Sequence, residues 1–104
     1  MQNQAQAPLI EPDLAEAALT LAELAASCAV PADWLLQHVQ DGLVQPLTGE
    51  QNQWRFSYRS RIRVQRILVL ERDFDAVPEL AALVADMQEE IAELKRRLYQ
   101  AGIE

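Results

Sequence analysis

The chain has 104 residues, is 50% hydrophobic and 24% charged, and is therefore too apolar for a disordered protein but ordinary for a folded one. This length leaves room for one compact domain with one or two further elements, and we expect no second core. The formal net charge of −7 is uneven, because residues 1–54 contain seven acids and no Lys or Arg. Such a surface repels nucleic acids and anionic lipids and attracts basic proteins, although an acidic bias that only serves solubility is the alternative.

Residues 1–18 contain Pro8 and Pro12 and show weak periodicity, so we expect a flexible N-terminal tail. The first residues are polar and uncharged, and no apolar run approaches the 18 or more residues of a membrane span. We therefore expect a soluble cytoplasmic protein with no membrane contact.

Two short helices follow the tail. Thr20 stands three residues before Glu23, the spacing of a capping box, which predicts a helix start. This helix should end near Ala29, and Pro31 should open a second helix that stops at Gly42. Two helices joined by a turn of three to four residues predict a helix-turn-helix.

A β-hairpin wing and a third helix are predicted next. Leu43–Val44 and Trp54–Phe56 are expected to pair as short strands around a polar turn at 48–53. Apolar residues then recur at helical spacing without Gly or Pro, which predicts a helix over 57–74.

The last predicted helix, from Pro78 to about Gln100, shows the sharpest pattern. Six apolar residues are spaced 4, 3, 4, 3 and 4 apart, which is the a/d pattern of a coiled coil, and a seventh widens its first turn. We expect these seven residues to form a dimer interface: Leu80, Leu83, Val84, Met87, Ile91, Leu94 and Leu98. The alternative is that this helix folds back on its own domain.

Residues for catalysis are missing from the sequence. It contains one histidine, His38, which follows Trp34 and Leu35 by about one turn and is expected to be structural, and it contains no glycine-rich phosphate loop. The single cysteine, Cys28, lies among apolar residues and is expected to be a small core residue. We therefore predict no enzyme, no cofactor and no metal.

A MerR-like DNA-binding regulator is the serious alternative, since a helix-turn-helix with a wing often reads DNA. The second helix of such a motif needs basic or amide side chains at base edges, but here residues 31–41 carry two acids and no base. Five arginines form the only basic cluster, which could contact phosphate or pair with acids of the same chain. They are Arg55, Arg59, Arg61, Arg63 and Arg66.

Taken together, these segments resemble the MerR-like winged-helix group, and most closely its CbpM-type chaperone modulator branch, over about residues 19–99. The segments that carry the resemblance are Leu21-Ala-Glu-Leu-Ala25, the turn at Val30, Asp41-Gly-Leu-Val-Gln-Pro46, Trp54-Arg-Phe56, Arg61-Ile62 with Leu68 to Asp73, and the final heptad helix. MerR-type regulators carry arginines in the second helix and just after the proline that corresponds to Pro46. This chain has Trp34 and Gln37 in the second helix and residues 47–49 after the proline. Cysteines for metal or effector binding beyond the last helix are also absent, which favours the modulator branch.

The resemblance implies a mainly α fold with three parts: a flexible tail (1–18), a winged helix-turn-helix domain (19–75) and a C-terminal coiled-coil dimerisation helix (76–104). It also implies a homodimer that binds the J-domain of a CbpA-like DnaJ homologue and inhibits its stimulation of Hsp70. The relevant J-domain surface is characteristically basic, so an acidic binder is complementary to it. We expect the partner-binding residues to be Glu23, Asp33, Trp34, Gln37 and Asp41, although Trp34 as a plain core residue is the alternative.

Overall fold

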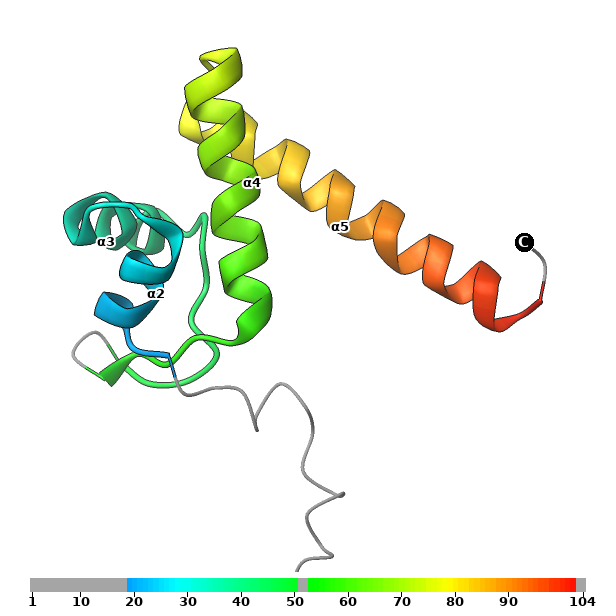
Figure 1. Cartoon of the computed structure of the whole chain (residues 1–104), viewed down its shortest axis with the longest axis horizontal. Helices are drawn as coiled ribbons and strands as arrows, with labels where there is room; N and C mark the ends of the chain where they lie inside the picture. Colours follow the sequence, from blue (N-terminus) through cyan, green and yellow to red (C-terminus); the bar gives the residue numbers. More distant parts are fainter. Residues whose placement is uncertain (1–18, 51–52, 103–104) are drawn as a thin grey trace, which may run out of the picture. The chain divides into compact units, whose positions relative to one another are not determined.

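A computed structural model describes residues 19–50 and 53–102, and the expected N-terminal tail lies outside these residues. The described chain is mainly helical, with helices α2, α3, α4 and α5 in that order (Figure 1). It divides into two compact units at Gln65 and Arg66, within α4, and each unit is described separately below.

Helix α2 spans Leu21–Cys28 and begins at the capping box predicted from the sequence. The Thr20 hydroxyl accepts a hydrogen bond from the Glu23 N–H at 3.1 Å, and the Glu23 carboxylate accepts one from the Thr20 N–H at 2.9 Å. The helix ends because Ala29 is left-handed (φ 59°), which lets the Val30 N–H return to the Ala25 carbonyl at 3.0 Å.

Helix α3 spans Ala32–Gln40 and completes the predicted helix-turn-helix. Gly42 stops it as expected, since its φ of 79° allows the Leu43 N–H to reach the His38 carbonyl at 2.9 Å. The core of the first unit is formed by apolar side chains from both helices and from the segments that follow. These side chains are Leu24, Ala25, Cys28, Leu35, Val39, Val44, Phe56 and Val64.

The predicted β-hairpin wing is wrong as stated, since no strand longer than a single bridge occurs in residues 19–50 and 53–102. Thr48 bridges Arg55, and Leu19 bridges Phe56. Leu43 and Val44 do not pair with the expected partner strand, Trp54–Phe56. Both of their N–H groups donate instead to the His38 carbonyl at the end of α3. Pro46 has no N–H donor, so it cannot extend a ladder from Val44 toward Thr48.

Helix α4 spans Tyr58–Phe74, within one residue of the predicted bounds. Its first half belongs to the first unit, where the Cys28 thiol donates to the Arg61 carbonyl at 3.8 Å. The Arg63 Nε donates to the Leu43 carbonyl at 2.8 Å, so α4 also holds the segment that follows α3.

The second unit contains the end of α4 and helix α5, Pro78–Gln100. Asp75 follows α4 with a φ of 58°, and three residues, 75–77, connect the two helices. The buried residues of α5 lie in its first turns: Ala81 and Ala85 are fully buried, and Ala82 is 5% exposed.

Candidate functional site

The outer face of α3 brings together three of the five predicted partner-binding residues. Asp33, Gln37 and Asp41 are four residues apart, so they share one side of the helix, and all three are exposed. The Gln37 Nε2 donates to the Asp41 Oδ1 at 3.0 Å, which orients both groups. Because α3 contains no Lys or Arg, this face carries negative charge and amide groups only.

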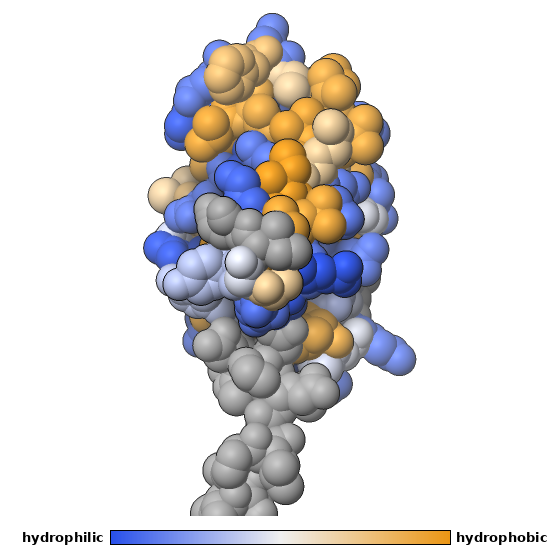
Figure 2. Space-filling model, turned by 90° about the vertical axis from the view of Figure 1, so that its right-hand side faces the viewer, coloured by the Kyte–Doolittle hydropathy of each residue, from blue (hydrophilic) through white to orange (hydrophobic). Residues whose placement is uncertain are grey.

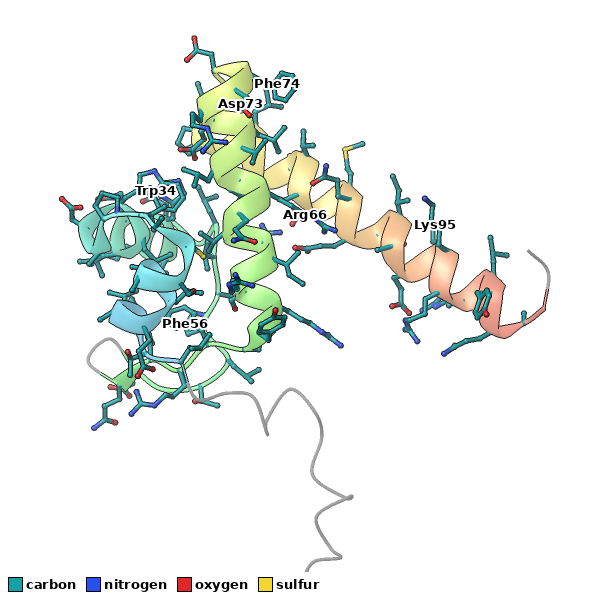
Figure 3. All side chains as sticks on the ribbon, viewed as in Figure 1. Trp34, Phe56, Arg66, Asp73, Phe74 and Lys95 are labelled. Carbon is teal, nitrogen blue, oxygen red and sulfur yellow. The ribbon has the colours of Figure 1, made fainter. Side chains whose placement is uncertain are left out.

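Trp34 lies at the edge of this face and is half-buried. Its indole stacks on the His38 ring, with centroids 3.7 Å apart, and Figure 3 shows it on the outer side of the helix pair. His38 itself is 5% exposed, and its Nδ1 lies 2.8 Å from the Trp34 carbonyl oxygen. The histidine thus supports the tryptophan and packs in the core, as a structural residue does.

Glu23 is exposed but stands apart from the other four predicted residues. Its carboxylate caps the N-terminus of α2, whereas α3 follows the other end of that helix. The eight residues of α2 correspond to about 12 Å along the helix axis. The structure therefore groups Asp33, Trp34, Gln37 and Asp41 and assigns Glu23 a capping role.

The arginine cluster makes several contacts within the chain. Arg55 donates to the Gln53 and Trp54 carbonyls, and Arg63 donates to the Leu43 carbonyl. Arg61 donates to the Tyr58 hydroxyl at 3.2 Å, and its guanidinium lies 5.6 Å from the centre of that ring. The partners in these contacts are carbonyl and hydroxyl oxygens rather than the acids expected, and the contacts use donors that a phosphate would otherwise need.

Cys28 is buried, as expected of a core residue. Burial raises the pKa of its thiol, although the Ser27 hydroxyl and the Arg61 charge oppose this shift. A thiol in this state is a poor nucleophile and a poor metal ligand at neutral pH. Within the described residues, no group of three or more His, Cys, Asp or Glu side chains is placed to hold a metal ion.

The predicted a/d residues of α5 form an exposed apolar stripe. Six of the seven side chains are between 45% and 55% exposed, and Val84 is half-buried. Figure 2 shows apolar side chains gathered over much of the upper part of one face of the molecule. No helix among the described residues combines the length and apolar composition needed to cross a membrane.

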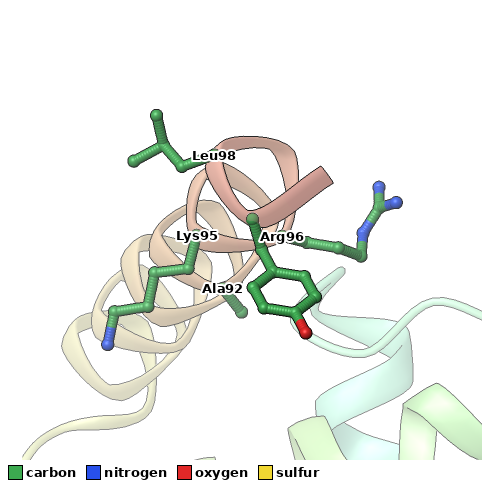
Figure 4. Close-up of a pocket in the computed structure, with 5 residues that line it drawn as sticks. Ala92, Lys95, Arg96 and Leu98 are labelled. Carbon is green, nitrogen blue, oxygen red and sulfur yellow. The ribbon is translucent and has the colours of Figure 1, made fainter. Parts of the chain in front are cut away.

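A second feature of α5, an open groove near its C-terminal end, was missed by the sequence analysis. Ala92 lies between longer side chains, and the depression measures about 710 Å³ (Figure 4). Its remaining lining residues are Lys95, Arg96, Leu98 and Tyr99. The available signal was a second heptad series one residue after the apolar stripe, which contains Ala81, Ala85, Ala92 and Tyr99.

Comparisons with known proteins agree with this architecture. The family model described as MerR HTH family regulatory protein matches residues 19–100. The chain is also 27% identical over 77 residues to the chaperone modulatory protein CbpM of Pseudomonas entomophila (strain L48), covering 74% of this chain and 76% of that protein. No solved structure matches significantly.

Both matches are named as regulatory or modulatory proteins, and the resemblance found in the sequence is confirmed. The chain therefore belongs to the MerR helix-turn-helix regulatory protein family, and within it the chain is similar to the chaperone modulator CbpM.

Proposed function

We propose that this protein is a cytoplasmic chaperone modulator that binds the J-domain of a CbpA-like DnaJ homologue and inhibits its stimulation of Hsp70. The similarity to a protein named chaperone modulatory protein CbpM supports the general role. In this proposal the helix-turn-helix domain, residues 19–75, contacts the J-domain, and residues 76–104 join two copies.

The observation that carries the proposal is the charge of the outer α3 face. In a DNA-reading helix-turn-helix this helix enters the major groove, where each acid repels phosphate and loses the gain from counterion release. Asp33 and Asp41 occupy that face, with Trp34 beside them as a large half-buried aromatic anchor. An acidic rim around an aromatic anchor suits a basic protein surface, because complementary charge speeds association and selects the partner.

The proposal can be tested by titrating the J-domain of a DnaJ homologue from the same organism into the full chain by calorimetry. We expect 1:1 binding per chain and loss of J-protein-stimulated Hsp70 ATPase activity. The variant Asp33→Lys/Asp41→Lys should bind at least tenfold more weakly at low salt, and the difference should shrink at high salt because screening weakens the charge contribution.

A matched control is Glu50→Lys/Glu79→Lys, which makes the same change in net charge at two exposed positions outside α3. Equal effects of the two double variants would place the J-domain contact elsewhere. Tight, sequence-selective binding of duplex DNA at physiological salt, without J-domain affinity, would favour the DNA-binding regulator instead.

We also propose that the protein is a homodimer joined through the apolar stripe of α5. Covering the exposed half of one such side chain contributes about 1 kcal/mol, so two stripes of seven residues contribute on the order of 14 kcal/mol. Association itself costs roughly 4–15 kcal/mol, and the balance suits a dimer of moderate stability.

Sedimentation of the full chain at micromolar concentration tests the dimer. We expect a dimer for the natural sequence and a monomer for Ile91→Glu, which places a charge in the middle of the stripe. Gln100→Glu, at an exposed position outside the stripe, is the control and should remain dimeric. A monomeric natural protein would contradict the proposal.

A further inference from the structure

The first two turns of α4 have an exposed side with apolar residues between two arginines. Tyr58, Ile62 and Gln65 are spaced 4 and 3 residues apart, so they share one side of the helix. Tyr58 is 50% exposed and Ile62 is 41% exposed. Arg59 follows Tyr58 and Arg61 precedes Ile62, so the two arginines lie on opposite edges of this side. We call these five residues the α4 face.

The α4 face is basic as well as apolar. Residues 58–65 contain three arginines and no Asp or Glu. The N-terminus of a helix is the positive end of its dipole, and the first turn of α4 contains no acid. The Arg61 guanidinium lies 5.6 Å from the centre of the Tyr58 ring and donates to the Tyr58 hydroxyl, which holds this charge beside the apolar side chains. A segment that suits this face therefore combines apolar residues with acids.

The N-terminal segment of the same chain has this composition. Residues 9–18 contain no Lys or Arg. Their large apolar residues are Leu9, Ile10 and Leu14, and their acids are Glu11, Asp13 and Glu16. The segment is thus complementary to the α4 face both in charge and in apolar character.

This segment joins the described chain close to the α4 face. Leu19 bridges Phe56, whose N–H donates to the Leu19 carbonyl at 2.9 Å (Figure 1). Phe56 stands two residues before Tyr58, the first residue of α4. The face extends about 10 Å along the helix axis. Residues 9–18 span roughly 33 Å when extended, so they are long enough to cover it.

Charge and attachment favour this segment over other occupants of the α4 face. The J-domain surface in the proposed function is basic, so Arg59 and Arg61 repel it, whereas the acidic outer face of α3 attracts it. A segment that is covalently attached nearby also has a high effective concentration at the face. It therefore competes well with free anions, including the phosphates of nucleic acids.

We propose that residues 9–18 bind the α4 face of the same chain, with their apolar residues on Tyr58 and Ile62 and their acids beside Arg59 and Arg61. The bound segment shields these arginines from nucleic acids and other polyanions. For residues 9–18 this differs from the flexible tail that the sequence predicts. The inference depends neither on J-domain binding nor on the proposed dimer, because it concerns a contact within one chain.

Photo-cross-linking of the full-length protein tests the contact. Tyr58 is replaced by p-benzoylphenylalanine in a ¹⁴N chain, which is mixed with an unmodified ¹⁵N chain so that mass spectrometry separates cross-links within a chain from those between copies. We expect the main cross-link within the ¹⁴N chain, at residues 9–18. A cross-link only to the ¹⁵N chain would show that a second copy covers the face and would overturn the inference. A cross-link within the chain but outside residues 9–18 would also overturn it.

Neutralising two acids of the segment tests the role of charge in the same experiment. Asp13→Asn/Glu16→Gln in the labelled chain should lower the yield of this cross-link to less than about half, and high salt should lower the yield of the natural segment as well. Glu50→Gln/Glu79→Gln makes the same change in net charge at two exposed positions outside the segment and the α4 face, and should leave the yield unchanged. Equal yields from the two double variants would contradict the proposed contact.

Affinity for duplex DNA gives a second, independent readout. We expect Asp13→Asn/Glu16→Gln to bind a random-sequence duplex roughly fivefold more tightly than the natural protein at low salt, as measured by fluorescence anisotropy. Glu50→Gln/Glu79→Gln should change this affinity by less than about twofold. Equal duplex affinities for the two double variants would show that the segment does not shield the arginines and would overturn the inference.

Discussion

The indole of Trp34 and the imidazole of His38 stack across one turn of α3, with their planes 28° apart and their centroids separated by 3.7 Å. His38 is buried against the core and its Nδ1 lies 2.8 Å from the Trp34 carbonyl oxygen, so the ring that supports the tryptophan is itself held in place. A large aromatic surface is thereby preorganised beside the acidic residues of α3, which lowers the entropy cost of binding a partner.

Replacement of Trp34 should therefore affect binding more than replacement of the other tryptophan. We expect Trp34→Ala to weaken J-domain binding by about 2 kcal/mol, or roughly 30-fold, as truncation of an interface anchor does. Calorimetry measures the affinity, and urea unfolding of the same samples measures the free energy of unfolding. Trp54→Ala is the control, because Trp54 is also half-buried but packs against Phe56 outside α3. Similar losses of affinity in the two variants would indicate that Trp34 acts only through stability.

The capping box of α2 should contribute measurably to stability. Thr20→Ala removes the hydroxyl that accepts from the Glu23 N–H, and we expect a loss of about 1 kcal/mol. For a domain of this size the melting temperature should fall by roughly 4–8 °C, as measured by circular dichroism. Thr48→Ala, at an exposed threonine whose backbone bridges Arg55, should change the melting temperature by less than half as much. No difference between the two variants would mean that α2 does not depend on this cap.

Gly49 should tolerate alanine worse than Gly42 does. Both have positive φ, 95° and 79°, so alanine costs about 1–2 kcal/mol at either position. Only at Gly49 would a Cβ also collide with the backbone carbonyl of Gln53, whereas nothing lies within 4 Å at Gly42. We expect Gly49→Ala to lower the free energy of unfolding at least 1 kcal/mol more than Gly42→Ala does, as measured by urea unfolding. The reverse order would show that the backbone around Gly49 rearranges without cost.

Cys28 should make stability fall at alkaline pH. Burial raises the pKa of the folded thiol above the ordinary value of 9.0, so the unfolded chain loses this proton first. The contribution is fully present below about pH 9 and is lost as the pH rises toward the folded pKa. Urea unfolding at pH 7.5 and pH 10 should show a steeper loss for the natural protein than for Cys28→Ala. Parallel losses would mean that the thiol is solvated in the folded state, and rapid alkylation by iodoacetamide at pH 7.5 would lead to the same conclusion.

The sequence by itself determined the four helices, because their signals are local. The Thr20–Glu23 capping box, the stop at Gly42 and the heptad spacing of α5 each depend on residues within a few turns, and the structure has these helices within one or two residues of the predicted bounds. The acidic outer face of α3 could also be predicted, since residues four apart share one side of a helix.

Only the tertiary structure decided which backbone and side-chain groups are hydrogen-bonded within the chain and which side chains are buried. The expected hairpin partner of Leu43–Val44 was taken by another segment, because the Phe56 N–H donates to the carbonyl of Leu19, far away in the sequence. Arg63 is a weaker candidate for phosphate binding, because its Nε already donates to the carbonyl of Leu43, 20 residues earlier in the chain. Ala85 is buried and Ala92 is exposed although both belong to one heptad series, a difference that the spacing in the sequence does not contain. Periodicity describes the face of a single helix, whereas burial and hydrogen bonding depend on the segments that the folded chain brings against that face.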